Sequence, residues 1–169
     1  MNCKEEELQL ELFNLLINPS KTKYEIAWHR DAIPLETPEA LEAELLKINH
    51  YGCQWNTALY DDASLIVVPG SHSRPRTPEE RKMIFENLNC VLPDQLVVKL
   101  KPGQTVFYNN NILHRAVYPL DSEKKRRTLH ACIGMTKGGT KRADNIFQHG
   151  LDWLKNETEM HKVLPARYS

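Results

Sequence analysis

Apolar and β-branched residues recur along the chain in short runs, and turn-forming Pro, Gly, Asn and Asp residues separate these runs. Runs of this length and composition are typical of strands joined by turns. The pattern predicts eight strands, over residues 12–18, 24–31, 54–61, 64–70, 95–101, 105–109, 113–119 and 126–134. Eight short strands favour a barrel or a two-sheet jelly roll, because closure or sheet pairing hides the strand edges.

Three further stretches have the spacing of helices, 37–48, 77–88 and 144–163. In the first, Leu41, Leu45 and Ile48 lie on one apolar stripe. The second begins with Thr77 and has Glu80 three positions later, the usual signature of a helix start. The expected architecture is therefore mainly β with a few flanking helices.

Length and charge narrow the class of protein. The 169 residues are enough for one hydrophobic core, so we expect a single domain over 1–169. Its core would comprise about 12–134, and a C-terminal helical segment about 144–163. Lys plus Arg and Asp plus Glu number 22 each, so no overall field attracts nucleic acid. No apolar run approaches the ~20 residues that a membrane span needs. We expect no nucleic-acid or membrane partner.

The chain starts with an acidic segment, MNCKEEE, which lacks the basic start and apolar centre of a signal peptide. We therefore expect a cytoplasmic protein. Its four cysteines are far apart and include no CxxC pair, which argues against a zinc finger and favours free thiols.

Candidate metal ligands stand at two places in the pattern. His29 and Asp31 are two residues apart at the end of an expected strand, so alternation directs both side chains to one face. His114 opens a later expected strand after a polar turn. Two imidazoles and one carboxylate are the facial set that holds Fe(II) in non-haem oxygenases and leaves adjacent positions open for a chelating keto acid and dioxygen.

A keto acid with a second carboxylate needs a cationic anchor. The basic run 124–127 (KKRR) offers two arginines, Arg126 and Arg127, whose planar donor forks match a carboxylate.

Several motifs resemble the phytanoyl-CoA dioxygenase-like family in both order and spacing. They are WHRDA at 28–32, ALYDD at 58–62, LIVVPGSH at 65–72, LKPGQ at 100–104 and HRA at 114–116. Members of that family are Fe(II)- and 2-oxoglutarate-dependent dioxygenases with a double-stranded β-helix, a cupin-like jelly roll. The resemblance covers about residues 12–134.

The resemblance implies roles for individual residues. His29, Asp31 and His114 would bind Fe(II), and an arginine on the last strand would bind the far carboxylate of 2-oxoglutarate. Arg126 shares a face with Thr128 and His130, as the family pattern requires, whereas Arg127 shares a face with apolar residues. We therefore favour Arg126, although a slip of one residue would reverse the choice.

Two polar residues on the third expected strand, Gln54 and Asn56, share a face and are candidates for contacts around the keto acid. His72, which ends the PGSH motif, is expected at the rim of the site. Nothing in the sequence names the small-molecule substrate.

Only 28 residues precede His29, fewer than in the family as a whole, where upstream elements cover one sheet. The stretch 145–163 or a second subunit could cover that sheet instead, so a homo-oligomer is one expectation. Two other functions stay open, a non-catalytic jelly-roll metal-binding module and a cupin-type metal enzyme that does not use 2-oxoglutarate.

Overall fold

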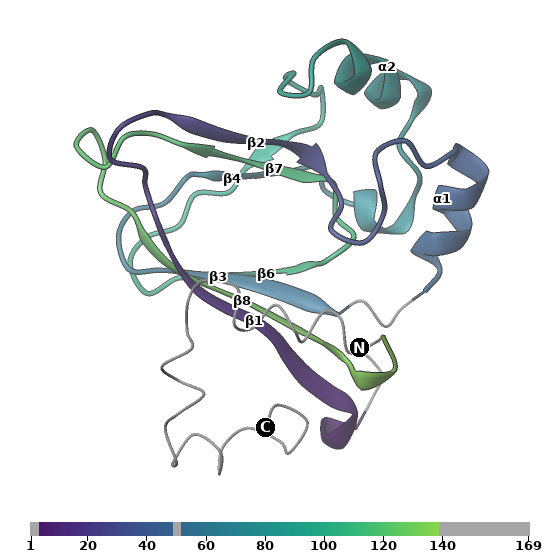
Figure 1. Cartoon of the computed structure of the whole chain (residues 1–169), viewed down its shortest axis with the longest axis horizontal. Coiled ribbons are helices and arrows are strands. Elements are labelled where there is room, and N and C mark those ends of the chain that lie inside the picture. The colour runs from purple at the N-terminus through teal and green to yellow at the C-terminus, as the bar shows by residue number, and fades with distance from the viewer. Residues whose placement is uncertain (1–3, 49–51, 139–169) are drawn as a thin grey trace.

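The computed structural model describes residues 4–48 and 52–138 and consists of two antiparallel sheets that face each other (Figure 1). One sheet has the order β1-β8-β3-β6 and the other the order β2-β7-β4-β5. The strands of the first sheet are β1 (Leu8–Ile17), β8 (Arg127–Met135), β3 (Cys53–Ala58) and β6 (Thr105–Asn109). Those of the second are β2 (Tyr24–His29), β7 (His114–Tyr118), β4 (Leu65–Val67) and β5 (Leu96–Val97). Each sheet thus joins strands from both halves of the chain, and the prediction of a mainly β, double-stranded β-helix with a few helices is confirmed.

All eight expected strands are present, seven of them with changed bounds. β1 starts four residues earlier than expected, and the expected strand at 95–101 is reduced to the two residues of β5. The expected helix at 144–163 lies outside the described residues.

Two helices lie beside the second sheet, at the end where β2 stops and β7 begins (Figure 1). They are α1 (Glu39–Leu46) and α2 (Pro78–Glu86). The Thr77 hydroxyl accepts a hydrogen bond from the Glu80 amide at 3.1 Å, and the Glu80 carboxylate accepts one from the Thr77 amide at 2.7 Å. This reciprocal cap begins α2 where the sequence predicts a start.

The apolar stripe of the expected helix is buried only in part, since Leu45 and Ile48 are half-buried. Leu41 is 52% exposed, and the buried residue of the helix is Glu42, which is fully inaccessible. The physical reason is a group of arginines from distant segments that surrounds the Glu42 carboxylate. An apolar side chain at this position could not satisfy those guanidinium groups.

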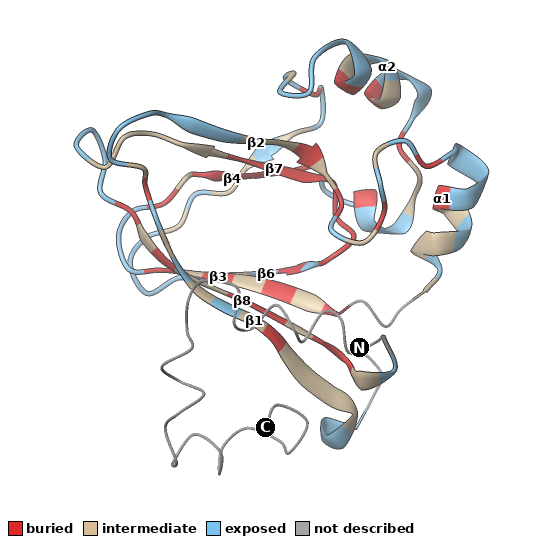
Figure 2. Cartoon of the chain, in the orientation of Figure 1, coloured by how far each residue is buried: buried red, intermediate tan, exposed pale blue. Residues whose placement is uncertain are grey.

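Buried apolar residues form two clusters, one on each face of the second sheet. The larger lies between this sheet and α2 and contains Trp28, Ile66, Val68, Ile84, Leu92 and Leu113. The smaller lies between the two sheets and contains Leu65, Val67, Tyr108 and Ile112. Figure 2 shows the buried positions along β4 and β7, the two central strands of the second sheet. These two strands therefore give the site a buried support.

None of the helices in the described parts of the chain has both the length and the apolar character needed to cross a membrane. The three cysteines of this part, Cys53, Cys90 and Cys132, are free thiols, as predicted.

Candidate metal centre

Two imidazoles meet where β2 ends and β7 begins. His29 and His114 are partners in the antiparallel register of these strands, and their ring centroids are 4.2 Å apart. The register of β2 shifts between Ile26 and His29. Asp31 lies two residues past the end of β2, so its carboxylate reaches the same space from the following bend, not from the strand itself.

The three side chains are close enough to bind one ion. Asp31 Oδ1 lies 3.5 Å from His29 Nε2 and 3.8 Å from His114 Nε2, and one ligand atom from each residue falls within 4.8 Å of the others. The distances of 3.5 and 3.8 Å are shorter than the combined length of two typical metal–ligand bonds of ~2.1 Å each. A single divalent cation can therefore contact all three side chains.

Backbone carbonyls set the tautomer of both histidines. The carbonyl oxygen of Ala27 lies 2.8 Å from His29 Nδ1, and that of Ile112 lies 2.9 Å from His114 Nδ1. Because a carbonyl only accepts, each Nδ1 carries the hydrogen, and each Nε2 keeps the lone pair that a metal ligand needs. These two contacts fit a metal site better than a packed core.

The surroundings shift the pKa values of the two histidines in opposite directions. Burial lowers the pKa of His114, which favours the neutral imidazole. Burial also acts to lower the pKa of His29, but the hydrogen bonds to Asp31 and to the Ala27 carbonyl outweigh it, so this pKa is raised.

A short chain of hydrogen bonds orients Asp31. The side-chain amide of Gln54 donates to Asp31 Oδ2, and Gln54 Oε1 accepts from the Tyr108 hydroxyl at 3.1 Å. Gln54 and Tyr108 are both buried, on neighbouring strands β3 and β6. Asn56, the other candidate on β3, contacts His130 instead, with 2.7 Å between Asn56 Oδ1 and His130 Nδ1. The structure thus places both candidates in the cavity wall but only Gln54 against a candidate ligand.

Arg126 lies in the wall of the same cavity, 2% exposed. Its Nε donates to Asp62 Oδ2 at 2.8 Å, and its guanidinium carbon lies 4.7 Å from the centre of the Tyr118 ring. Its Nη1 is buried and has no hydrogen-bond partner among residues 4–48 and 52–138. A buried guanidinium nitrogen without an acceptor is costly, and an anionic ligand would satisfy it.

Asp62 holds Arg126 in place and also accepts from Thr128. The Thr128 hydroxyl lies 2.6 Å from Asp62 Oδ2, and the Ser64 amide lies 2.8 Å from Asp62 Oδ1. Burial alone would raise the pKa of Asp62, but Arg126 and the Thr128 hydroxyl outweigh it and lower this pKa. Thr128, a candidate for contacts with 2-oxoglutarate, is therefore linked to Arg126 through Asp62.

Arg127 points the other way. It forms an ion pair with Asp121 at 2.7 Å, and about a third of its side chain is exposed. Of the two arginines between which the sequence leaves a choice, Arg126 is the one that faces the cavity.

The cavity between the two sheets has a volume of about 450 Å³, within the range of small-molecule sites. All three candidate ligands and Arg126 line it, together with apolar side chains from both sheets. The apolar members are Leu12, Leu16, Ile26, Leu65 and Ala116.

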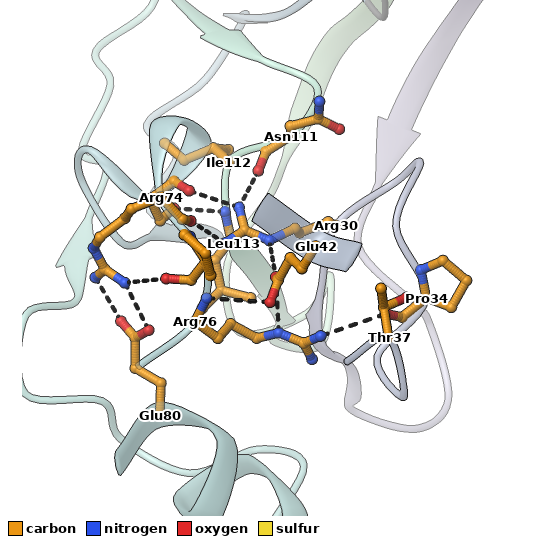
Figure 3. A network of polar contacts seen from close by, with 12 residues as sticks. Arg30, Pro34, Thr37, Glu42, Arg74, Arg76, Glu80, Asn111, Ile112 and Leu113 are labelled. Carbon is orange, nitrogen blue, oxygen red and sulfur yellow. Dashed lines mark hydrogen bonds and ion pairs between the residues drawn. The ribbon is translucent and has the colours of Figure 1, made fainter. Parts of the chain in front are cut away.

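A buried ionic network supports the end of β2 that carries the candidate ligands (Figure 3). Arg30, between His29 and Asp31, donates from Nε to Glu42 Oε1 at 2.8 Å, and Arg76 Nε donates to the same oxygen at 3.0 Å. Arg81 donates to Glu42 Oε2. Burial would raise the pKa of Glu42, but the charges of Arg76 and Arg30 lower it, so the carboxylate stays ionised.

The same network joins the two ligand-bearing segments. Arg30 Nη1 donates to the carbonyl oxygens of Ser71 and Asn111, the second of which lies three residues before His114. The Ser71 hydroxyl in turn accepts from the Leu113 amide at 2.7 Å. The PGSH turn therefore ties the end of β2 to the beginning of β7.

Several residues in the cavity wall or in contact with it were not identified from the sequence. Asp62, Tyr108 and Glu11 carry no local signal of a site, because their partners come from distant strands. His72, expected at the rim, lines a separate pocket beside α1.

Comparisons with known proteins support the fold. No model of a known protein family and no curated protein matches the sequence. Among solved structures, AviO1 from Streptomyces viridochromogenes Tue57 matches with a TM-score of 0.52 and 19% identity over 76% of this chain and 52% of its own. EctD from S. alaskensis, crystallised with 2-oxoglutarate and 5-hydroxyectoine, matches with a TM-score of 0.51 and 15% identity. The match covers 78% of this chain and 45% of EctD.

SnoN, described as a non-heme alpha-ketoglutarate dependent epimerase from nogalamycin biosynthesis, matches with a TM-score of 0.51 and 21% identity. The match covers 75% of this chain and 46% of SnoN. The chain thus spans about half the length of these three structures. What they share with it at these identities is the fold.

Proposed function

We propose that this protein is an Fe(II)- and 2-oxoglutarate-dependent dioxygenase that acts on a small molecule. One observation carries the proposal: a two-histidine, one-carboxylate cluster shares a 450 Å³ cavity with a buried arginine whose Nη1 lacks an acceptor among the described residues. The first group suits Fe(II), and the second suits the far carboxylate of a dicarboxylic keto acid.

In this proposal each residue has a defined task. His29, Asp31 and His114 hold the iron, and Arg126, fixed by Asp62, binds the distal carboxylate of 2-oxoglutarate. When bound, iron, 2-oxoglutarate and dioxygen supply the oxidising power, with hydroxylation of a substrate C–H bond and release of succinate and carbon dioxide. The protein contributes placement of the reactants and an apolar wall that excludes water.

The family resemblance of the sequence motifs supports the same class. EctD and SnoN add that this fold serves enzymes that work with 2-oxoglutarate. We place the protein in the phytanoyl-CoA dioxygenase-like group on the motifs alone. A fatty-acyl-CoA substrate does not follow, since fold and motif do not specify the substrate.

Anaerobic titration of the apo-protein with Fe(II) and 2-oxoglutarate tests the proposal. The chelate of both has a weak visible charge-transfer band, which we expect in the wild type. His114→Ala should abolish the band. Arg126→Ala should weaken 2-oxoglutarate binding at least about tenfold, since a charged hydrogen bond is lost.

The neighbouring Arg127→Ala is a matched control, because this arginine pairs with Asp121 away from the cavity. Its titration should superimpose on that of the wild type. Iron binding without a band at any 2-oxoglutarate concentration would instead favour a cupin-type metal enzyme. A band without turnover of any small molecule would favour the non-catalytic metal-binding module.

A further inference from the structure

A further pocket lies at the end of the molecule where β1 stops and β2 begins. We call it the end pocket; it has a volume of about 700 Å³, within the range of small-molecule sites, and a mainly apolar wall. Leu16, Ile26 and Tyr118 belong both to this wall and to that of the cavity with the candidate metal ligands, so the two spaces are neighbours. Neither the candidate ligands nor Arg126 lines the end pocket, which the proposed function therefore leaves unassigned.

Two stacked tyrosines form part of its wall. Tyr24 and Tyr118 are partners in the register of β2 and β7, with 5.7 Å between ring centroids and 15° between ring planes. Tyr118 also contacts Arg126, whose guanidinium carbon lies 4.7 Å from the ring centre. Tyr24 is nevertheless 57% exposed, and Ile17, in the same wall, is 56% exposed. A ligand ring that packs here would remove this apolar surface from water.

A buried hydrogen-bond acceptor belongs to the same wall. Asn18 lines the end pocket and is 3% exposed. Its Nδ2 donates to the Lys124 carbonyl oxygen at 2.7 Å, which identifies the other end of the amide as the oxygen, because a carbonyl only accepts. Asn18 Oδ1 has no hydrogen-bond partner in the described ranges 4–48 and 52–138. A buried acceptor without a partner is costly, and a hydroxyl or N–H group of a ligand would satisfy it.

The two charged residues of the wall already pair with each other. Arg127 and Asp121 form an ion pair at 2.7 Å, so their charges cancel. An anionic or cationic ligand would have to compete with one of the two partners, whereas a neutral ligand leaves the pair intact. The chemistry of the end pocket therefore favours a neutral molecule.

We propose that the end pocket binds a neutral aromatic molecule that carries a hydroxyl or N–H donor, such as a phenol or an indole. The ring packs against the tyrosine pair, and the donor reaches the buried oxygen of Asn18. This inference is independent of the proposed function, because neither iron nor 2-oxoglutarate enters it.

Three probes of similar size test the inference: 4-methylphenol, 4-methylanisole and 4-methylcyclohexanol. The second lacks the hydroxyl donor, and the third keeps the hydroxyl on a ring that is not aromatic. Each is titrated into the full chain without metal or keto acid, and the NMR signal of the ring methyl group, which all three share, reports binding. We expect 4-methylphenol to bind the wild type about tenfold tighter than 4-methylanisole and about threefold tighter than 4-methylcyclohexanol, as a hydrogen bond and an aromatic contact would provide.

Two variants locate the bound molecule. Asn18→Leu, which keeps the volume but removes the acceptor, should erase the preference for 4-methylphenol over 4-methylanisole. Tyr24→Ala should weaken binding of 4-methylphenol about threefold or more, since the aromatic contact is lost. Phe85→Ala is the matched control, because this aromatic residue of α2 is 89% exposed and does not line the end pocket. It should bind 4-methylphenol as the wild type does.

Absence of 4-methylphenol binding would overturn the inference, as would equal or tighter binding of either other probe to the wild type. A preference that survives Asn18→Leu would overturn it too. Binding that Tyr24→Ala leaves unchanged would place the molecule elsewhere, for example in the cavity with the candidate metal ligands, and would also refute the inference. If Asn18→Leu does not fold, the comparison of probes in the wild type and the effect of Tyr24→Ala decide.

Discussion

Gln54 shows how one uncharged residue can orient a candidate metal ligand. Its amide group lies between Asp31 and Tyr108, donating to the first and accepting from the second. It thereby leaves Asp31 Oδ1 turned toward the two imidazoles. Hydrogen-bond partners of this kind fix the orientation of metal ligands and tune their affinity.

Replacing Gln54 with Leu should weaken Fe(II) binding by roughly 10- to 100-fold, the usual effect of removing such a partner. Tyr108→Phe, which removes only the more distant bond, should have a smaller effect. Isothermal titration calorimetry with Fe(II) under argon measures both. Gln104→Leu, at an exposed turn, serves as the control, and equal affinity of the Gln54 and Gln104 variants would argue against an orienting role.

At the scale of elements, buried ion pairs hold α1 against the rest of the molecule. Its buried residue is Glu42, which receives hydrogen bonds from three arginines on other segments, whereas Leu41 faces solvent. The network also reaches the carbonyl of Asn111, three residues before His114. The position of the helix and the geometry of the candidate ligands are therefore linked.

We expect Glu42→Gln to lower the free energy of unfolding by about 3–5 kcal/mol, because the substitution leaves buried guanidinium groups without their carboxylate. Glu39→Gln, at an exposed position of the same helix, should change it by less than about 0.5 kcal/mol. Urea denaturation followed by circular dichroism gives both values. A loss below about 1 kcal/mol for Glu42→Gln would mean that the arginines find other acceptors.

Acid should weaken the fold through the same carboxylates. The pKa values of Glu42, Glu80 and Asp62 are lowered in the folded chain, in each case because arginine partners outweigh the effect of burial. Groups with a lowered folded pKa stabilise the protein above their unfolded values of about 4, and this contribution is lost as the pH falls through the folded values. The contribution of these three carboxylates to the free energy of unfolding should hardly change from pH 7 to about 5 and then fall steadily toward pH 3. Stability that increases on acidification would contradict this assignment.

At the scale of the whole molecule, the two sheets differ in their outer faces. α2 packs on the second sheet, whereas the outer face of the first exposes Phe13, Leu15, Ile17 and Phe107 by 49–68%. Exposed apolar patches often mark association surfaces. Coverage of this face by a second subunit or by the stretch 145–163 stays a prediction.

Substitutions on the two faces should differ in effect. Phe107→Thr on the exposed face should change the free energy of unfolding by less than about 0.5 kcal/mol and reduce the binding of a hydrophobic dye. Leu113→Ala in the buried cluster should lower the free energy by about 2–5 kcal/mol. Denaturant titration at several protein concentrations measures both. If Phe107→Thr lowers stability only at high concentration, the face is covered by another copy of the chain.

The sequence by itself predicts much of this protein, because strand periodicity is local. Alternation and turn residues identify eight strands, and the same alternation separates Arg126 from Arg127 by face. The pair His29 and Asp31, with His114 at the start of a later strand, is visible as a candidate metal set before any fold is known. The structure then brings these three side chains together.

Only the tertiary structure decides the choice of distant partners. That Glu42 is buried, that Asp62 fixes Arg126 and that Glu11 enters the cavity depends on side chains 34 to 121 residues away in sequence. A hydrophobic pattern describes which residues leave water, but it carries no information about which buried charge meets which. Those pairings depend on the three-dimensional neighbours, since a charge is buried only where its partner is already in place.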